Sequence, residues 1–144
     1  MKNEYKGPRV DTVVDVAIFN QMNTKTLLCR KPDQILWQFV GGFASIDSPT
    51  FEDDAEREVK EECSICIGTI KYIGSCIIDD ERYRDTENKM KSLFFRARHI
   101  SGIPKAKDDI AEVRWFNMDN LNGKDLVTKH HPLLSMLMNS IIRF

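Results

Sequence analysis

The hydrophobic pattern near the amino end predicts a strand hairpin. Residues 10–19 (VDTVVDVAIF) are rich in β-branched side chains, and a polar turn at 20–25 separates them from a second apolar run, TLLCR. Further runs with strand character follow along the chain. They are LWQFV at 36–40, TIKYIGSCII at 69–78, SLFFRARH at 92–99 and EVRWFN at 112–117. A charged loop at 79–91 interrupts them, and we expect the middle of the chain to be mainly sheet.

Two other segments carry helix signals. After the glycine pair that ends the run at 36–40, Ser48-Pro49-Thr50 supplies N-cap and first-turn residues for a helix that continues to about Cys63. At the carboxyl end, residues 132–144 (PLLSMLMNSIIRF) repeat apolar side chains at helical spacing. These are Leu133, Leu134, Leu137 and Ile141. An amphipathic helix is therefore expected to close the chain.

The order of these elements indicates the fold class. Strands, a helix, more strands and a final helix, joined by short connections, predict an α+β fold. In particular, they favour an α/β/α sandwich with a mixed β-sheet flanked by the two helices. The 144 residues contain no repeat or low-complexity linker, and we expect a single domain over 1–144.

Composition narrows the classes of function. The 21 Lys and Arg against 22 Asp and Glu leave a formal charge of −1, so generic nucleic-acid binding is not expected. The start, MKNEYKGPRV, lacks the apolar run of a signal peptide, and no run approaches the roughly 20 residues that cross a bilayer. We therefore expect a cytoplasmic protein without a membrane partner. Its four cysteines follow no disulfide spacing and are expected to be reduced.

The first helix is unusually acidic. Between Pro49 and Cys63, seven acids accompany only two cations. The acids are Glu52, Asp53, Asp54, Glu56, Glu58, Glu61 and Glu62. The last three share one side of the helix near its negative end, where like charges and the helix dipole both disfavour them. Either this face is simply solvated, or a hard cation such as Mg²⁺ offsets the repulsion.

The residues around these acids resemble the signature of the Nudix hydrolases. From Gly42 through FASIDSPTFEDDAE to REVKEE, the chain is similar to the box G-x5-E-x7-R-E-U-x-E-E-x-G-U, where U is aliphatic. The early strand pair, the EVRWF strand after an acidic loop, and the last helix are also similar to the family's domain. The resemblance implies the family's fold and the Mg²⁺-dependent hydrolysis of a nucleoside diphosphate linked to another moiety.

Two positions depart from the box. The segment between Gly42 and Arg57 is one residue too long, so the family's early glutamate has no strict counterpart. Asp47 is the nearest acid and Glu52 is a second candidate. Ser64 replaces the late glycine, which puts a side chain where the helix is expected to end in a left-handed turn.

Roles carried over from the family fall on matching positions. The resemblance implies that Glu58 and Glu62 bind Mg²⁺, for which Mn²⁺ is a possible substitute. Glu61 is implied as a further ligand or as the base that activates water, and Arg57 as the residue that orients these acids. The family's backbone metal contact points to the carbonyl of Gly42.

A further acid is expected in the loop before the tryptophan-containing strand. Asp109 matches best, with Asp108 and Glu112 as competitors, and a merely solvated loop is the alternative. Asp109 is therefore a candidate catalytic residue alongside the box acids.

The loop at 79–91 offers candidate substrate contacts. Arg82 and Arg84 carry guanidinium groups suited to phosphate, and Tyr83 offers a ring for stacking on a base, although all three also suit an ordinary loop. Phe43, with Trp37 and Phe51, is a candidate wall for a base pocket, with burial in the core as the alternative. The expected partner is a small-molecule nucleotide, and the last helix leaves a homodimer possible.

The resemblance favours ADP-ribose or a nucleotide sugar as the substrate. A housecleaning hydrolase of nucleoside triphosphates and a Nudix-fold module that binds nucleotides without hydrolysing them are the alternatives. The Cys63 and Cys66 pair lacks further zinc ligands, and we expect burial instead. His130 and His131 are interpreted as solvent-facing or capping groups rather than site residues.

Overall fold

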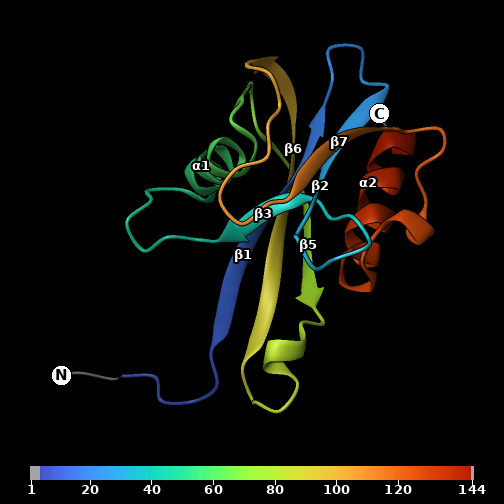
Figure 1. Ribbon diagram of the computed structural model, residues 1–144. Coiled ribbons are helices and arrows are strands. Elements are labelled where there is room, and N and C mark those ends of the chain that lie inside the picture. Colours follow the sequence, from blue (N-terminus) through green and yellow to red (C-terminus); the bar gives the residue numbers. More distant parts are fainter. Residues whose placement is uncertain (1–3, 144) are drawn as a thin grey trace.

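The computed structural model, which describes residues 4–143, has a mixed β-sheet with one long helix on each side (Figure 1). The strands are β1 (Val10–Phe19), β2 (Lys25–Arg30), β3 (Val40–Phe43), β4 (Cys66–Ile67), β5 (Lys71–Ile78), β6 (Lys89–Ser101) and β7 (Glu112–Asn117). The helices are α1 (Phe51–Cys63) and α2 (His131–Arg143), with short 3-10 turns η1 (Glu81–Tyr83), η2 (Gly123–Asp125) and η3 (Thr128–His130). The α+β sandwich expected from the sequence is confirmed.

The sheet is organised around β1. Its strands follow the order β4-β6-β1-β2-β7, while β3 pairs with β1 and β5 pairs with β6. The pairing of β1 with β6 is parallel, and the other strand pairs are antiparallel. β1 therefore pairs with three strands, β2, β3 and β6, and it lies at the centre of the sheet.

Alternate residues of β1 enter two separate apolar cores. Val13, Ala17 and Phe19 pack with the apolar face of α2, whereas Val14, Val16 and Ile18 pack with α1. This period of two is what a strand buried on both sides requires, because successive side chains point to opposite faces. It explains why 10–19 reads as a nearly continuous apolar run.

Several expected boundaries differ from the structure. In the run at 36–40, Trp37 and Gln38 form isolated bridges and only Val40 belongs to a strand. That strand, β3, includes the two glycines that were expected to form a turn. The helix N-cap is Thr50, whose hydroxyl accepts from the Asp53 N–H. β4 was not anticipated, and β6 begins three residues earlier than expected, inside the segment interpreted as a loop. Such short or polar strand ends carry little periodic signal.

No helix in residues 4–143 is both long enough and apolar enough to span a bilayer. Position 144 of the expected last helix lies outside the described residues.

Helix α1 ends at Ser64, where the sequence signature has a glycine, and this position allows the energetic cost of the replacement to be measured. Ser64 is the C-cap at φ 62° and ψ 29°, and its N–H donates to the carbonyl of Lys60. Ser64→Gly removes a Cβ from this left-handed position, and we expect it to raise the free energy of unfolding by about 0.5–1 kcal/mol in urea denaturation. Ser64→Ala keeps the Cβ and is the control. An equal gain in both variants would contradict the left-handed strain as the cause.

Candidate active site

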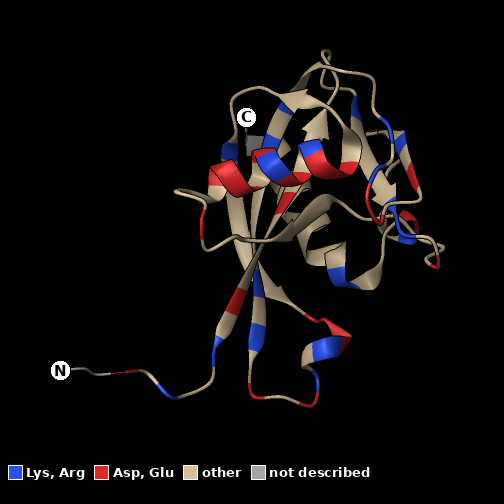
Figure 2. Ribbon diagram, turned by 60° about the vertical axis from the view of Figure 1, so that its left-hand side comes forward, with Lys and Arg blue, Asp and Glu red and all other residues tan. Residues whose placement is uncertain are grey.

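The acidic helix α1 lies against β3 at the centre of the candidate site. Ala55, Val59 and Cys63 are fully buried against the sheet, and acidic side chains recur along the remaining turns of the helix (Figure 2). Glu58 and Glu62 are one turn apart beside this apolar stripe, so docking of the stripe also brings both carboxylates to β3.

Glu62 is the most enclosed of the three box acids. Its residue is 7% exposed, and its Oε1 accepts a hydrogen bond from the Gly41 N–H at 3.1 Å. Burial raises the pKa of Glu62 to about 8, and the negative charges of Glu58 and Asp109 add to the rise. The carboxylate thus lies where a positive charge would stabilise its ionised form.

Glu58 lies directly against the glycine pair. A Cβ at Gly42 would fall 2.5 Å from the carboxylate of Glu58, so no residue larger than glycine fits without displacing this side chain. Burial raises the pKa of Glu58, although the ion pair with Arg57 opposes the rise. Gly42 therefore permits a close approach between the backbone of β3 and the carboxylate of Glu58.

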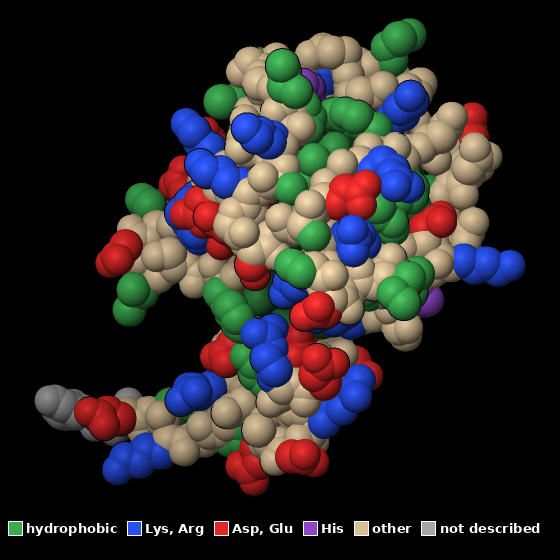
Figure 3. Space-filling view, viewed as in Figure 1, with side chains coloured by type: hydrophobic (Ala, Val, Ile, Leu, Met, Phe, Trp, Pro, Cys, Tyr) green, Lys and Arg blue, Asp and Glu red, His purple; other side chains and the backbone are tan. Residues whose placement is uncertain are grey.

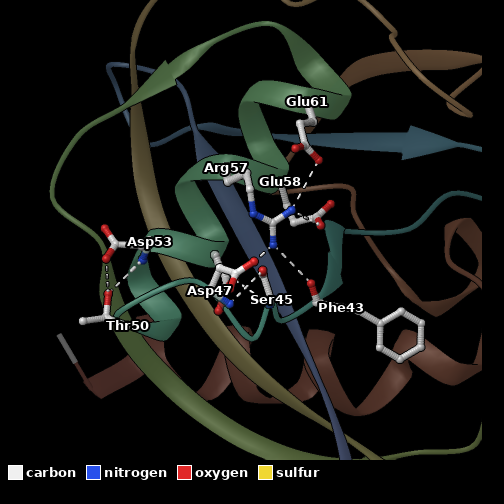
Figure 4. A network of polar contacts seen from close by, with 9 residues as sticks. Phe43, Ser45, Asp47, Thr50, Asp53, Arg57, Glu58 and Glu61 are labelled. Carbon is white, nitrogen blue, oxygen red and sulfur yellow. Dashed lines mark hydrogen bonds and ion pairs between the residues drawn. The ribbon is translucent and has the colours of Figure 1, made fainter.

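The guanidinium of Arg57 holds the neighbouring acids in place. It donates to Glu58 at 2.9 Å and Glu61 at 3.3 Å, and to the carbonyl of Phe43 at 3.2 Å (Figure 4). It also donates to Asp54 at 3.0 Å. Arg57 thus contacts three acids of its own helix and one backbone carbonyl of β3.

Asp54 supports Arg57, a role that was not predicted from the sequence. Asp54 is buried and accepts from the Ser45 N–H at 2.8 Å, while no ion pair in the described chain joins Arg57 to Asp47 or Glu52. Burial alone would raise the pKa of Asp54, but hydrogen bonds from Ser45, Ser48 and Arg57 bring it below the ordinary value. Asp54 precedes Arg57 by three residues on one helix, and this spacing alone could have predicted their ion pair.

The loop before β7 reaches the end of α1. The Lys107 N–H donates to the backbone carbonyl of Glu62 at 3.1 Å, which brings Asp108 and Asp109 to the same cavity as Glu62. Glu112, the competing acid, instead pairs with Arg30 at 3.0 Å and with Arg114 at 3.2 Å, and it does not line that cavity. The geometry favours Asp109 and Asp108 over Glu112.

These side chains surround one cavity of about 320 Å³, hereafter the catalytic cavity. Of the residues expected from the sequence, it brings together Gly42, Phe43, Glu58, Glu61, Glu62, Arg82, Asp108 and Asp109. Acidic and basic side chains lie side by side where the narrow part of the molecule joins its main body (Figure 3). Arg57 does not line the catalytic cavity itself, but it contacts Glu58 and Glu61, which do.

Only one residue of the expected substrate-binding trio lines the catalytic cavity. Arg82 lies over the ring of Phe43, 5.3 Å from its centroid, and donates to both oxygens of Asp80 at 2.8 and 2.9 Å. Tyr83 donates to Asp11 at 2.6 Å, and the exposed Arg84 pairs with Asp79. Neither of these two faces the cavity.

Asp15 and His130 line the same cavity, and the sequence analysis did not single out Asp15. His130 is buried, not solvent-facing, and its Nδ1 accepts from the Phe39 N–H at 3.1 Å. Its Nε2 lies 3.8 Å from Asp15, which also accepts from the Ser92 hydroxyl at 2.6 Å. Burial raises the pKa of Asp15 to about 7 and lowers that of His130 to about 3. An acid flanked by valines inside an apolar strand was the signal for Asp15.

Other expected candidates lie elsewhere. Trp37 is buried and packs edge-on against Phe116, with ring centroids 5.1 Å apart, while Phe51 is exposed outside the catalytic cavity. Cys63 is buried, as expected of this pair, but Cys66 is exposed. His131 contacts the backbone carbonyl of Gly123 at 2.8 Å, in keeping with a capping role.

The chemistry of the donors fits a hard divalent cation. Glu58, Glu61, Glu62 and Asp109 present only oxygen atoms, and the charges of Glu58 and Asp109 disfavour the ionised form of Glu62. In the geometry of residues 4–143, however, no three His, Cys, Asp or Glu side chains are close enough together to hold a metal ion. Glu58 and Glu61 are instead turned towards Arg57. A cation would therefore share these carboxylates with Arg57.

Comparison with protein families supports the sequence signature. A family model described as the NUDIX domain matches residues 10–137. The NUDIX domain of Shewanella oneidensis NrtR, solved as a complex with ADP ribose, superposes with a TM-score of 0.72 at 16% identity. That match covers 95% of this chain and 90% of the NrtR chain. At such low identity it shows the common fold alone.

Two curated relatives resemble the chain in sequence. It is 28% identical over 116 residues to the NAD-capped RNA hydrolase NudC of Vibrio vulnificus (strain CMCP6), covering 79% of this chain and 41% of that protein. It is 27% identical over 90 residues to the oxidized purine nucleoside triphosphate hydrolase of Mus musculus, covering 62% of this chain and 54% of that protein. The chain thus spans about half the length of these relatives.

The burial of Asp15 predicts a pH-dependent effect on stability. A carboxyl whose pKa rises from 3.8 to about 7 on folding binds its proton more tightly in the folded state. The contribution of Asp15 to the free energy of unfolding therefore falls as pH rises from about 4 to 7, and it stays low above that range. Asp15→Asn keeps an acceptor for Ser92 without the charge, and we expect its free energy of unfolding, relative to the unchanged chain, to be higher at pH 8 than at pH 4. Urea denaturation measures this, with the exposed Asp85→Asn as a charge control; a pH-independent difference would contradict the prediction.

Proposed function

Because the chain belongs to the NUDIX domain family, we propose that it hydrolyses the diphosphate bridge of a nucleoside diphosphate linked to another moiety. The proposed substrate is ADP-ribose or a nucleotide sugar. The observation that carries the proposal is the catalytic cavity, which the box acids line together with Asp109, Arg82 and Phe43. A cavity that combines acids for a cation with guanidinium and ammonium groups suits a diphosphate substrate.

Glu58, Glu62 and the carbonyl of Gly42 are the proposed holders of Mg²⁺, with Glu61 as a further ligand or the base. Mn²⁺ is a possible substitute. When bound, such a cation lowers the pKa of water and neutralises charge on the phosphates. The role of Arg57 is to hold the rotamers of Glu58 and Glu61, and Asp54 holds Arg57 in turn.

The reaction itself needs a nucleophile, a base and cations for the phosphates. Water adds to one phosphorus, the bridging P–O bond breaks, and two phosphate monoesters leave. The proton lost by water goes to a carboxylate of the cavity, either Glu61 or Asp109. Arg82, Lys31 and Lys129 line the cavity as cations for the phosphate oxygens, and the Phe43 ring offers an apolar surface beside Arg82.

Hydrolysis of nucleoside triphosphates is the second candidate. The similarity to the mouse triphosphate hydrolase favours it, and the same acids would serve that reaction. A binding module without turnover is less well supported, because the chain retains all three box glutamates in the cavity. A substrate panel separates these possibilities. It contains ADP-ribose, nucleotide sugars, NADH, capped RNA and nucleoside triphosphates. The hydrolysis products, such as nucleoside monophosphates, sugar phosphates or pyrophosphate, are measured in Mg²⁺ or Mn²⁺.

Glu62→Gln tests the cation-binding acids. The amide keeps an acceptor for the Gly41 N–H but removes the charge, so we expect kcat to fall by about 100-fold or more with little loss of stability. Glu56→Gln, an exposed acid on the same helix, is the matched control and should leave kcat unchanged. Turnover that survives in Glu62→Gln would contradict the site, whereas binding without turnover in the unchanged chain would indicate the sensor module.

Arg82→Gln tests the substrate contact. We expect KM to rise roughly tenfold with a smaller change in kcat, since a charged hydrogen bond to phosphate is lost. Asp80 keeps its ion pair with Lys129 at 3.2 Å, so the variant should fold. Arg84→Gln lies in the same loop but outside the cavity, and steady-state kinetics should show no change. If both substitutions changed the kinetics equally, the effect would come from a disturbed loop rather than from a lost contact with the substrate.

A further inference from the structure

A second and larger cavity, hereafter the α2 groove, lies away from the catalytic cavity. Its volume is about 970 Å³, and it is bounded by the end of β1, by β5 and β6, and by α2. No residue within 4–143 lines both cavities. A ligand in the α2 groove would therefore leave the candidate catalytic residues uncovered.

Three cations line the α2 groove without a compensating acid. Lys71 and Arg96 are direct cross-strand partners of β5 and β6, and Arg98 lies two residues further along the same strand. Like charges opposite each other in a sheet are destabilising. No acid lines this groove, and no carboxylate in the described part of the chain lies within ion-pair distance of the three cations. A bound anion would relieve this repulsion.

The groove also has an apolar wall. Arg96 lies over the ring of Phe19, 4.8 Å from its centroid, which holds the guanidinium in place at the sheet surface. Further lining comes from Ile73, Ile100 and Met136, and Asn23 and Asn139 line the same groove. Cations next to apolar carbon suit a molecule that is anionic at one end and weakly polar at the other.

We propose that the α2 groove binds an organic phosphate of nucleotide size. The phosphate contacts Lys71, Arg96 and Arg98, because ammonium and guanidinium groups are the usual protein donors to phosphate oxygens. The remainder of the ligand packs against Ile73, Ile100 and Met136. This site does not depend on the proposed reaction, since it shares none of the residues of the catalytic cavity.

Backbone amide NMR of the whole chain with AMP as the probe tests the site without any turnover. We expect the resonances of Gly68, Thr69 and Ser140 to shift on addition of AMP up to about 1 mM. Adenosine, which lacks the phosphate, should leave them in place. Shifts at Gly41 and Gly42 report the catalytic cavity separately, so failure of one site does not imply failure of the other.

The double variant Lys71→Gln/Arg98→Gln provides the specific test, because both side chains are exposed and Arg96 keeps its contact with Phe19. We expect it to weaken AMP binding in the groove about tenfold or more. The control Lys89→Gln/Lys91→Gln removes the same charge from exposed positions of β6 that line neither cavity. Unmoved groove resonances, equal binding by the two double variants, or equal shifts with adenosine would each overturn the proposal.

Discussion

The contacts of Arg57 tie the candidate site to the fold. Its guanidinium joins the first and last turns of α1 to the carbonyl of Phe43 at the end of β3. An exposed ion pair contributes little to stability, but Asp54 is buried, and loss of its partner would leave an unpaired buried carboxylate. The docking of α1 on β3 that this network supports is what brings Glu58 to Gly42 and Glu62 to the Gly41 N–H.

The geometry of β1 explains why a polar cavity exists inside an otherwise apolar sheet. Its alternating side chains fill both cores, yet Asp15 occupies a position on the α2 side among Val13 and Ala17. Ser92 and the neighbouring His130 provide polar surroundings, and Asp15 pairs in register with Gly41. The strand thus carries a titratable group to the base of the catalytic cavity while remaining part of the core.

The two cavities differ in their charge. The catalytic cavity combines several carboxylates with Arg82, Lys31 and Lys129, an arrangement suited to a cation and a phosphate together. In the α2 groove, by contrast, the charged lining residues among those described are all cations, and they lie beside an apolar wall. A net charge of −1 over the whole chain conceals this separation, because charges of one sign gather locally while the totals nearly cancel.

The sequence by itself determined the fold class, both long helices, and the box residues from Gly42 to Glu62. These follow from local periodicity and from an ordered motif whose members are close in the chain. Only the tertiary structure showed that Asp54 supports Arg57, that Asp109 and Arg82 meet the box acids, and that Tyr83 and Arg84 do not. It also brought Asp15 to His130 and Lys71 to Arg96. Such pairs come from elements far apart or from strand register, and burial and register are set by packing of the whole chain rather than by neighbouring residues.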